Sequence, residues 1–180
     1  AVALQNIGDL QGTMAASKGA PILGQIKYQG VEMEDGFDVV GRDQVGNMVY
    51  RGGALKGLPH GFGMQYVDTE SITYRGYWKE GMAHGDGGEA FDPEKDVLVY
   101  RGEWRQGLPD GQGTQFTWLD TPWSKVYAMR KVYEGAWRQG LPHGFGAEYD
   151  LETGQKVYEG HFTDGVRDGH STQQFDNGQI

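Results

Sequence analysis

The chain has 180 residues, of which 37% are hydrophobic, and it carries a net charge of −9 and no cysteine. The acidic balance disfavours nucleic-acid binding, which needs clustered lysine and arginine, and the absence of cysteine excludes disulfides and cysteine-based metal sites. No apolar run is long enough for a membrane-spanning helix.

Residues 1–49 have no regular pattern, but they echo the sequence that follows. Tyr28 comes nine residues after the glycine of Gly19-Ala20-Pro21, just as Tyr66 comes nine residues after the glycine of Gly57-Leu58-Pro59. Terminal repeats of an array have to shield an open edge. We therefore expect residues 1–49 to form an N-terminal cap of one or two degenerate repeats, and a flexible leader is the alternative.

From residue 50 onward, one motif occurs five times: aromatic-x-Gly-x-aromatic, then a glycine, then His/Asp-Gly-x-Gly. Its first residue, which we call position 0, is a tyrosine in every copy, and the copies are 24, 26, 33 and 25 residues apart: Tyr50, Tyr74, Tyr100, Tyr133 and Tyr158. Glycine occupies positions 2, 7, 11 and 13 in the first four copies. A period of about 20–50 residues indicates a stacked-repeat architecture.

Each copy predicts a β-hairpin. Positions 0 to 4 alternate as a strand does, and the glycine at position 7 supplies the positive φ of a tight turn. The glycines at positions 11 and 13 belong to a returning strand, where they leave room for the rings of the neighbouring hairpin. Because one hairpin is not stable alone, residues 50–180 are predicted to stack into an all-β fold: an elongated, groove-shaped, single-layer twisted antiparallel sheet.

The third step of the repeat is roughly eight residues longer than its neighbours, and the extra residues fall within 118–131. This insertion is rich in large apolar side chains, which makes it a candidate contact for a partner. Folding back over its own sheet is the alternative, and the sequence leaves both open. The candidate partner-binding residues here are Trp118, Trp123, Tyr127 and Met129.

The segment from Tyr133 to Gly146 follows Tyr-x-Gly-x-Trp-x-x-Gly-x-x-His-Gly-x-Gly almost completely. This pattern resembles the MORN repeat family, and the resemblance covers about residues 50–178. It implies a single-layer, groove-shaped array. The departures are Ala54 at position 4 of the first copy, Ala90 at position 16 of the second with Phe91 one place on, and Asp110 and Asp168 at position 10.

No residue pattern predicts catalysis, a cofactor or a metal site. His60, His84 and His143 share position 10, so they should lie about 10 Å apart, too far to share one ion. We interpret them as side chains that bond the turn backbone, as aspartate also can. Gly85–Gly88 lacks the Lys-Ser/Thr ending of a nucleotide-binding loop.

The repeated aromatic rings are the candidate partner-binding residues of the array. They should build the core, but a single-layer sheet leaves part of its apolar surface open, and such a patch usually marks a binding site. A partner helix or extended peptide suits a groove of this kind. A purely structural role in the core is the alternative for any one of these rings. The candidates are Tyr74, Trp78, Tyr100, Trp104, Phe116, Tyr133, Trp137 and Tyr149.

These observations predict a non-catalytic scaffold or protein–protein interaction module, a structural or adaptor subunit of a larger assembly. The alternatives are a phospholipid-binding membrane adaptor, which the net charge does not favour, and the regulatory or targeting region of an enzyme whose catalytic part lies elsewhere. Open sheet edges make self-association a further expectation. We expect an intracellular location, cytoplasmic, cytoskeletal or peripheral to a membrane assembly, with an organelle also open.

Overall fold

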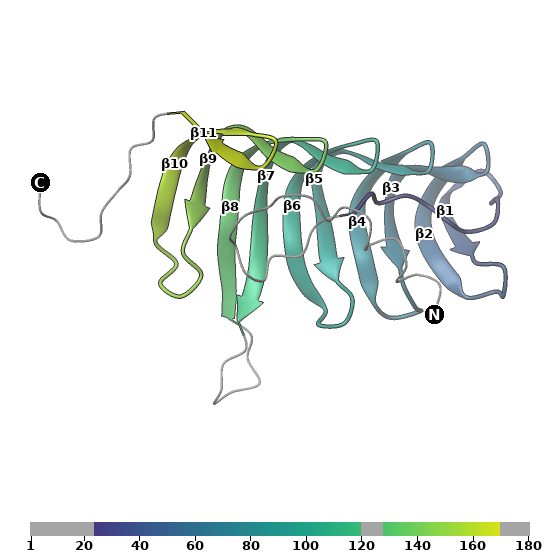
Figure 1. The fold of residues 1–180 in the computed structure, drawn as a ribbon. Coiled ribbons are helices and arrows are strands. Elements are labelled where there is room, and N and C mark those ends of the chain that lie inside the picture. Colours follow the sequence, from purple (N-terminus) through teal and green to yellow (C-terminus); the bar gives the residue numbers. More distant parts are fainter. Residues whose placement is uncertain (1–23, 120–127, 170–180) are drawn as a thin grey trace, which may run out of the picture.

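The computed structural model describes residues 24–119 and 128–169, which form one open antiparallel sheet of eleven strands paired in chain order (Figure 1). The predicted all-β, single-layer sheet of tandem hairpins is confirmed. Its strands are β1 (Gly36–Arg42), β2 (Met48–Leu55), β3 (Leu58–Tyr66), β4 (Ile72–Lys79), β5 (Met82–Asp92), β6 (Val97–Arg105), β7 (Leu108–Leu119), β8 (Ala128–Arg138), β9 (Leu141–Tyr149), β10 (Lys156–Thr163) and β11 (Val166–Asp168).

Each of the five repeats supplies one hairpin, from β2–β3 to β10–β11, and its turn has two residues. Position 7 is the glycine that the sequence predicted to have a positive φ, such as Gly107 with φ 79°. Position 6 has a positive φ as well, although it is never glycine: Gln106 has φ 51°. Two successive positive φ values match the right-handed twist of the strands they join, so all five turns share one tight geometry.

The tyrosines at position 0 and the rings at position 4 form a continuous ladder on one side of the sheet, which we call the core face. The ring of Tyr100 lies 5.2 Å from Trp104 in its own hairpin and 5.2 Å from Trp137 in the next, both edge to face. Such aromatic pairs contribute about 0.5–1.5 kcal/mol each beyond the area they bury. The ladder therefore joins successive hairpins into one core.

The glycine at position 13 makes room for a tyrosine of the same hairpin. A Cβ atom on Gly113 would lie 2.1 Å from the hydroxyl oxygen of Tyr100. That ring cannot move aside easily, because it is buried and its hydroxyl donates to the Glu103 carbonyl oxygen at 3.2 Å. The expectation that these glycines leave room for the rings of the neighbouring hairpin is incomplete, since the closest contact of Gly113 is within its own repeat, while a Cβ on Gly88 would also lie 2.6 Å from Trp104 of the next.

The second repeat holds one extra residue in β5. The pairing of β5 with β6 shifts between Gly85 and Gly88, and Gly88 takes the place that Gly113 has in the third repeat, since its Cβ would lie 2.5 Å from the Tyr74 hydroxyl. Ala90 pairs with Tyr74 as Gln115 pairs with Tyr100. The interpretation of Ala90 as a replaced aromatic is therefore wrong, and Phe91 is the equivalent residue.

Residues 28–42 repeat the tyrosine–glycine contact of the array. The Tyr28 hydroxyl donates to the Val31 carbonyl oxygen at 2.8 Å, as every position 0 tyrosine does three residues on. Its ring lies 5.9 Å from Tyr50, edge to face, and a Cβ on Gly41 would lie 2.6 Å from its hydroxyl. Tyr28 thus occupies position 0 of a degenerate repeat, not the position of Tyr66 that its spacing from Gly19 predicted.

The insertion lengthens the hairpin of β7 and β8. Trp118 pairs with Met129 and Leu119 with Ala128, so both strands continue past the ends of their neighbours (Figure 1). The expectation of an elongated loop over residues 118–131 is wrong for 118–119 and 128–131, which are strand. Trp123 and Tyr127 lie outside the described residues.

Candidate partner-binding surfaces

Six of the eight candidate rings of the array lie in the core. Each is at most 5% exposed and packs against other rings of the ladder, so a partner has no access to it in this conformation. Their structural role, the alternative in the sequence, accounts for these positions: Tyr74, Trp78, Tyr100, Trp104, Tyr133 and Trp137. Binding through them stays a prediction that requires the core to open.

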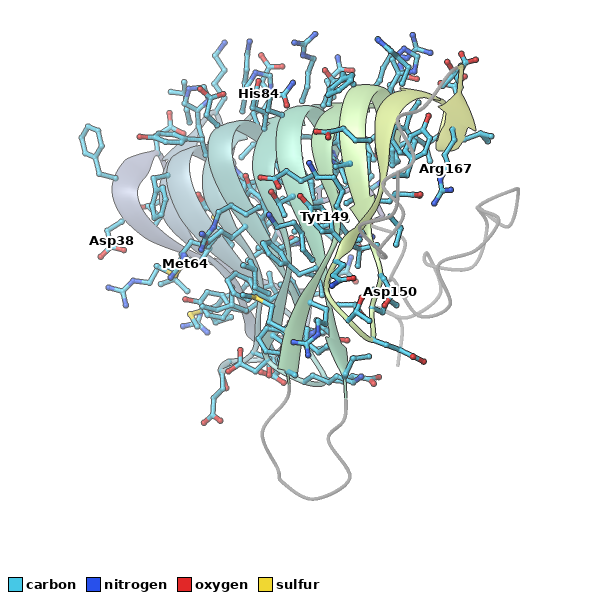
Figure 2. The ribbon with its side chains drawn as sticks, turned by 90° about the vertical axis from the view of Figure 1, so that its left-hand side faces the viewer. Asp38, Met64, His84, Tyr149, Asp150 and Arg167 are labelled. Carbon is cyan, nitrogen blue, oxygen red and sulfur yellow. The ribbon has the colours of Figure 1, made fainter. Side chains whose placement is uncertain are left out.

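The other two candidates, Phe116 and Tyr149, are half-buried at position 16. Figure 2 labels Tyr149 among the side chains of the sheet. The Tyr149 hydroxyl donates to the Glu134 carboxylate at 3.0 Å, and the Lys131 ammonium lies 4.9 Å from the ring centre. Burial and the hydrogen bond to Glu134 raise the pKa of Tyr149 above its ordinary value. The two rings therefore remain candidates that a partner can reach in part.

The opposite side of the sheet, the outer face, carries aromatic rings that the sequence analysis did not single out. Phe62 and Tyr77 are 51% and 55% exposed and lie 5.8 Å apart, edge to face. Phe145 is 56% exposed and lies 5.6 Å from His161. Both pairs join position 12 of one repeat to position 3 of the next. The sequence feature that could have revealed these pairs is the phenylalanine at position 12. Its side chain alternates with the glycines at positions 11 and 13 and therefore points to the outer face, where the core needs no ring.

Charged residues on the outer face are paired with one another. Glu89 is 8% exposed and its carboxylate accepts hydrogen bonds from Arg75 and Arg101, one on each side. Partial burial acts to raise the pKa of Glu89, but the hydrogen bonds from the two arginines outweigh it and hold the pKa below its ordinary value. Arg51 pairs with Asp38 at 2.9 Å. Two carboxylates, those of Glu89 and Asp38, therefore balance two of the three positive charges of these arginines.

The residue at position 10 bonds the turn of the following repeat. The Asp110 carboxylate accepts the backbone N–H of Gln139 at 3.2 Å, and Nδ1 of His143 accepts that of Asp164 at 3.4 Å. The interpretation of position 10 as a turn-bonding residue is confirmed for these two, and it stays a prediction for His60 and His84. Residues 24–119 and 128–169 contain no group of three side chains suited to a metal ion.

Residues 24–33, which we call the strap, cross the strands of the core face beside the turns instead of extending the sheet (Figure 1). Its backbone N–H groups at Ile26, Tyr28 and Met33 donate to the carbonyl oxygens of three turn glycines, Gly107, Gly81 and Gly57, at 2.7, 2.7 and 3.1 Å. The side chains of the same three strap residues pack against the ring ladder. The sequence analysis missed this contact.

Within the insertion, the two described candidates differ. The Trp118 indole N–H donates to the Leu98 carbonyl oxygen at 2.7 Å and the side chain is half-buried, so it folds back on its own sheet. Met129 is 46% exposed. Met129 is therefore the more accessible of this pair to a partner.

Comparison with known protein families gives matches that coincide with the repeats. The MORN repeat family model matches four segments, residues 74–88, 100–117, 133–149 and 158–180. A comparison with curated proteins found no match. The matched segments begin at position 0 of the second to fifth repeats, and the repeat with Ala54 at position 4 is not among them.

Proposed function

This chain carries an array of MORN repeats, and from that premise we propose that it is a non-catalytic scaffold that holds a protein partner. MORN repeats are generally associated with protein-binding and membrane-binding modules. The choice of a protein partner rests on the chemistry of the outer face.

The observation that supports this proposal is the exposed pair of Phe62 and Tyr77. The fold does not require it, because the corresponding paired positions 12 and 3 hold Gln112 and Ala136 two repeats later. Aromatic side chains held rigidly on a sheet and about half exposed are typical anchors of protein interfaces. A helix or an extended segment laid across the hairpins would contact this pair.

The test is photo-crosslinking in the native source, with a photoreactive residue in place of Tyr77. We expect a defined protein adduct whose yield falls at least about tenfold when Phe62→Ser is added. Gln112→Ser is the matched control, because Gln112 is an exposed position 12 residue two repeats away. An adduct that is insensitive to Phe62→Ser would contradict the proposal.

The alternative, a phospholipid adaptor, predicts binding to anionic vesicles that weakens with salt. The net charge of −9 and the pairing of Arg75 and Arg101 with Glu89 oppose it. No helix within residues 24–119 and 128–169 has the length and apolar character to cross a bilayer. We expect the chain not to float with anionic vesicles, and salt-sensitive flotation would favour the lipid adaptor.

A further inference from the structure

The strap is held on the array by main-chain hydrogen bonds across the turns of three hairpins. Its residues alternate between half-buried and exposed from Gly24 to Gly30, the pattern of an extended segment with one face against a surface. Ile26 also accepts a hydrogen bond from the backbone N–H of Ala83 at 3.1 Å, and Lys27 pairs with Met82 as an antiparallel bridge. The contact thus combines main-chain hydrogen bonds with apolar side chains, the two elements by which an extended peptide is recognised.

The site under the strap is built by three successive repeats with one geometry. The carbonyl oxygens of Gly57, Gly81 and Gly107 come from the same turn position, with φ between 76° and 79°. The N–H of Gly81 is bonded to the Pro59 carbonyl of the preceding repeat, and the N–H of Gly107 to that of Ala83. The turns are therefore linked to one another independently of the strap, which bonds the turn carbonyl oxygens and also accepts the backbone N–H of Ala83.

We propose that the turn edge of the core face at Gly57, Gly81 and Gly107 is a binding site for an extended peptide of a partner protein, and that the strap fills it in cis. The ligand it selects has an aliphatic residue and an aromatic residue two apart, with a free backbone N–H at both, like Ile26 and Tyr28. Proline at either position is excluded, because both N–H groups are hydrogen-bonded. This inference deepens the proposed protein-binding function but uses a surface other than that of Phe62 and Tyr77.

Because the strap belongs to the same chain, it competes with any partner peptide for the site. A tethered segment acts at an effective concentration that reaches about the millimolar range for short linkers. A free peptide of the same sequence therefore competes poorly with the intact strap. Weakening the strap's side-chain contacts, without touching the glycine turns, should expose the site.

The test uses the full chain and a fluorescein-labelled synthetic peptide of residues 24–34 as the probe. Ile26→Glu places a charge against the ring ladder and should release the strap, whereas Gln29→Glu introduces the same charge at an exposed strap position. We expect the peptide to bind the Ile26→Glu chain at least about tenfold more tightly than the wild-type or Gln29→Glu chain, measured by anisotropy. A peptide with serine in place of both Ile26 and Tyr28 should not bind.

The site itself offers a matched pair of variants in the Ile26→Glu background. A Cβ on Gly107 would lie 2.6 Å from the Ile26 carbonyl oxygen of a bound segment, while a Cβ on Gly81 would meet nothing closer than the Leu58 side chain at 3.5 Å. Asparagine tolerates the left-handed φ of both turns. Gly107→Asn should therefore abolish peptide binding, and Gly81→Asn should preserve it.

Three results would overturn the inference: no peptide binding to the Ile26→Glu chain, equal binding with Gly107→Asn, or a strap in the Ile26→Glu chain whose amide protons remain as protected as in the wild type. Each is separable from the proposed function, because Phe62→Ser should leave peptide binding unchanged. Loss of the Tyr77 crosslink with intact peptide binding, or the reverse, identifies which of the two proposals fails.

Discussion

The five hairpins and the strap both contribute apolar side chains to the same core face, but they are held there by different means. A hairpin such as β6–β7 pairs along its length with strands on both sides, and its rings lock against glycines and against the next hairpin. The strap touches the array through the turn glycines, the backbone of Ala83 and the side chains of Ile26, Tyr28 and Met33. Of these side chains, Tyr28 alone packs against a glycine and a ladder ring as a hairpin tyrosine does.

The hairpins therefore build the fold, whereas the strap lies on its core face. Repeated, interlocking contacts make the ladder one cooperative unit, whereas a segment with few main-chain bonds at one edge can open locally at lower free energy. Changes in the ladder should therefore lower global stability, and changes in the strap should act mostly on its own attachment. The following predictions test that division, from the largest expected effect to the smallest.

Trp104→Ala should destabilise the chain by about 3–5 kcal/mol, because it leaves a cavity between two tyrosines of the ladder. The ring is 2% exposed and its indole N–H donates to the Gly88 carbonyl oxygen at 3.1 Å. Urea unfolding measures the loss, and Tyr77→Ala on the outer face should lower the free energy of unfolding by no more than about 1 kcal/mol, the contribution of a cross-strand aromatic pair. Equal effects of the two substitutions would refute the distinction between core face and outer face.

Gly113→Ala should cost about 1–3 kcal/mol as an overpacking substitution, because its Cβ would collide with the Tyr100 hydroxyl. Gly24→Ala in the strap is the control, since no atom lies within 4 Å of the Cβ it would add. Thermal or urea unfolding should show a loss for Gly113→Ala alone. If both variants are neutral, the contact between tyrosine and glycine does not constrain the hairpin.

Glu89→Gln should lower stability by about 1–2 kcal/mol near pH 7, a value below that of a fully buried ion pair because Arg75 and Arg101 are about half exposed. Since the folded-state pKa of Glu89 is lowered, its stabilisation is complete above the ordinary pKa of glutamate and is lost as the pH falls through the lowered value. The difference between wild type and variant should therefore disappear in acid. The exposed Glu70→Gln is the control, and a difference that grows in acid would contradict this reasoning.

Gln106→Gly should stabilise the chain by about 0.5–1 kcal/mol. A non-glycine residue at φ 51° carries a steric cost that glycine avoids, although glycine also raises the entropy of the unfolded chain. The relevant hydrogen bond to the strap uses the Gln106 carbonyl oxygen and should survive. A denaturation midpoint below that of the wild type would show that the turn is unstrained.

The sequence predicted the parts of the structure that repeat, because position 0, the glycine at position 7 and the turn-bonding role of Asp110 are each set by local geometry. It did not predict the shift at Gly88. Gly87 precedes Gly88, so the second copy still has glycine at position 13 and matches the motif despite its extra residue. The positive φ at Gln106 was not predicted, because a positive φ is usually expected only at glycine. Tyr28 was assigned to the wrong position by a spacing that extended to Gly19.

The candidate contact surfaces were harder to predict for a physical reason. The ladder rings are the most regular feature of the sequence, and regularity reflects packing rather than binding, so six of the eight candidates are buried. The strap is held by backbone N–H groups, which almost any residue provides, and by contacts to turns up to 81 residues away in the chain, as between Gln25 and Gln106. Such a contact leaves no periodic signal.

The most direct measurement of the division between ladder and strap is native-state hydrogen exchange, read residue by residue in the full chain. The amide protons of Ile26 and Tyr28 should exchange by local opening, faster than those of Gly81 and Gly107, which donate within the array. Gly107→Asn should accelerate exchange at Ile26, and Gly81→Asn should not. Exchange of the strap amides at the rate of global unfolding, unchanged by Gly107→Asn, would contradict the claim that the strap is a separable occupant of the turn edge.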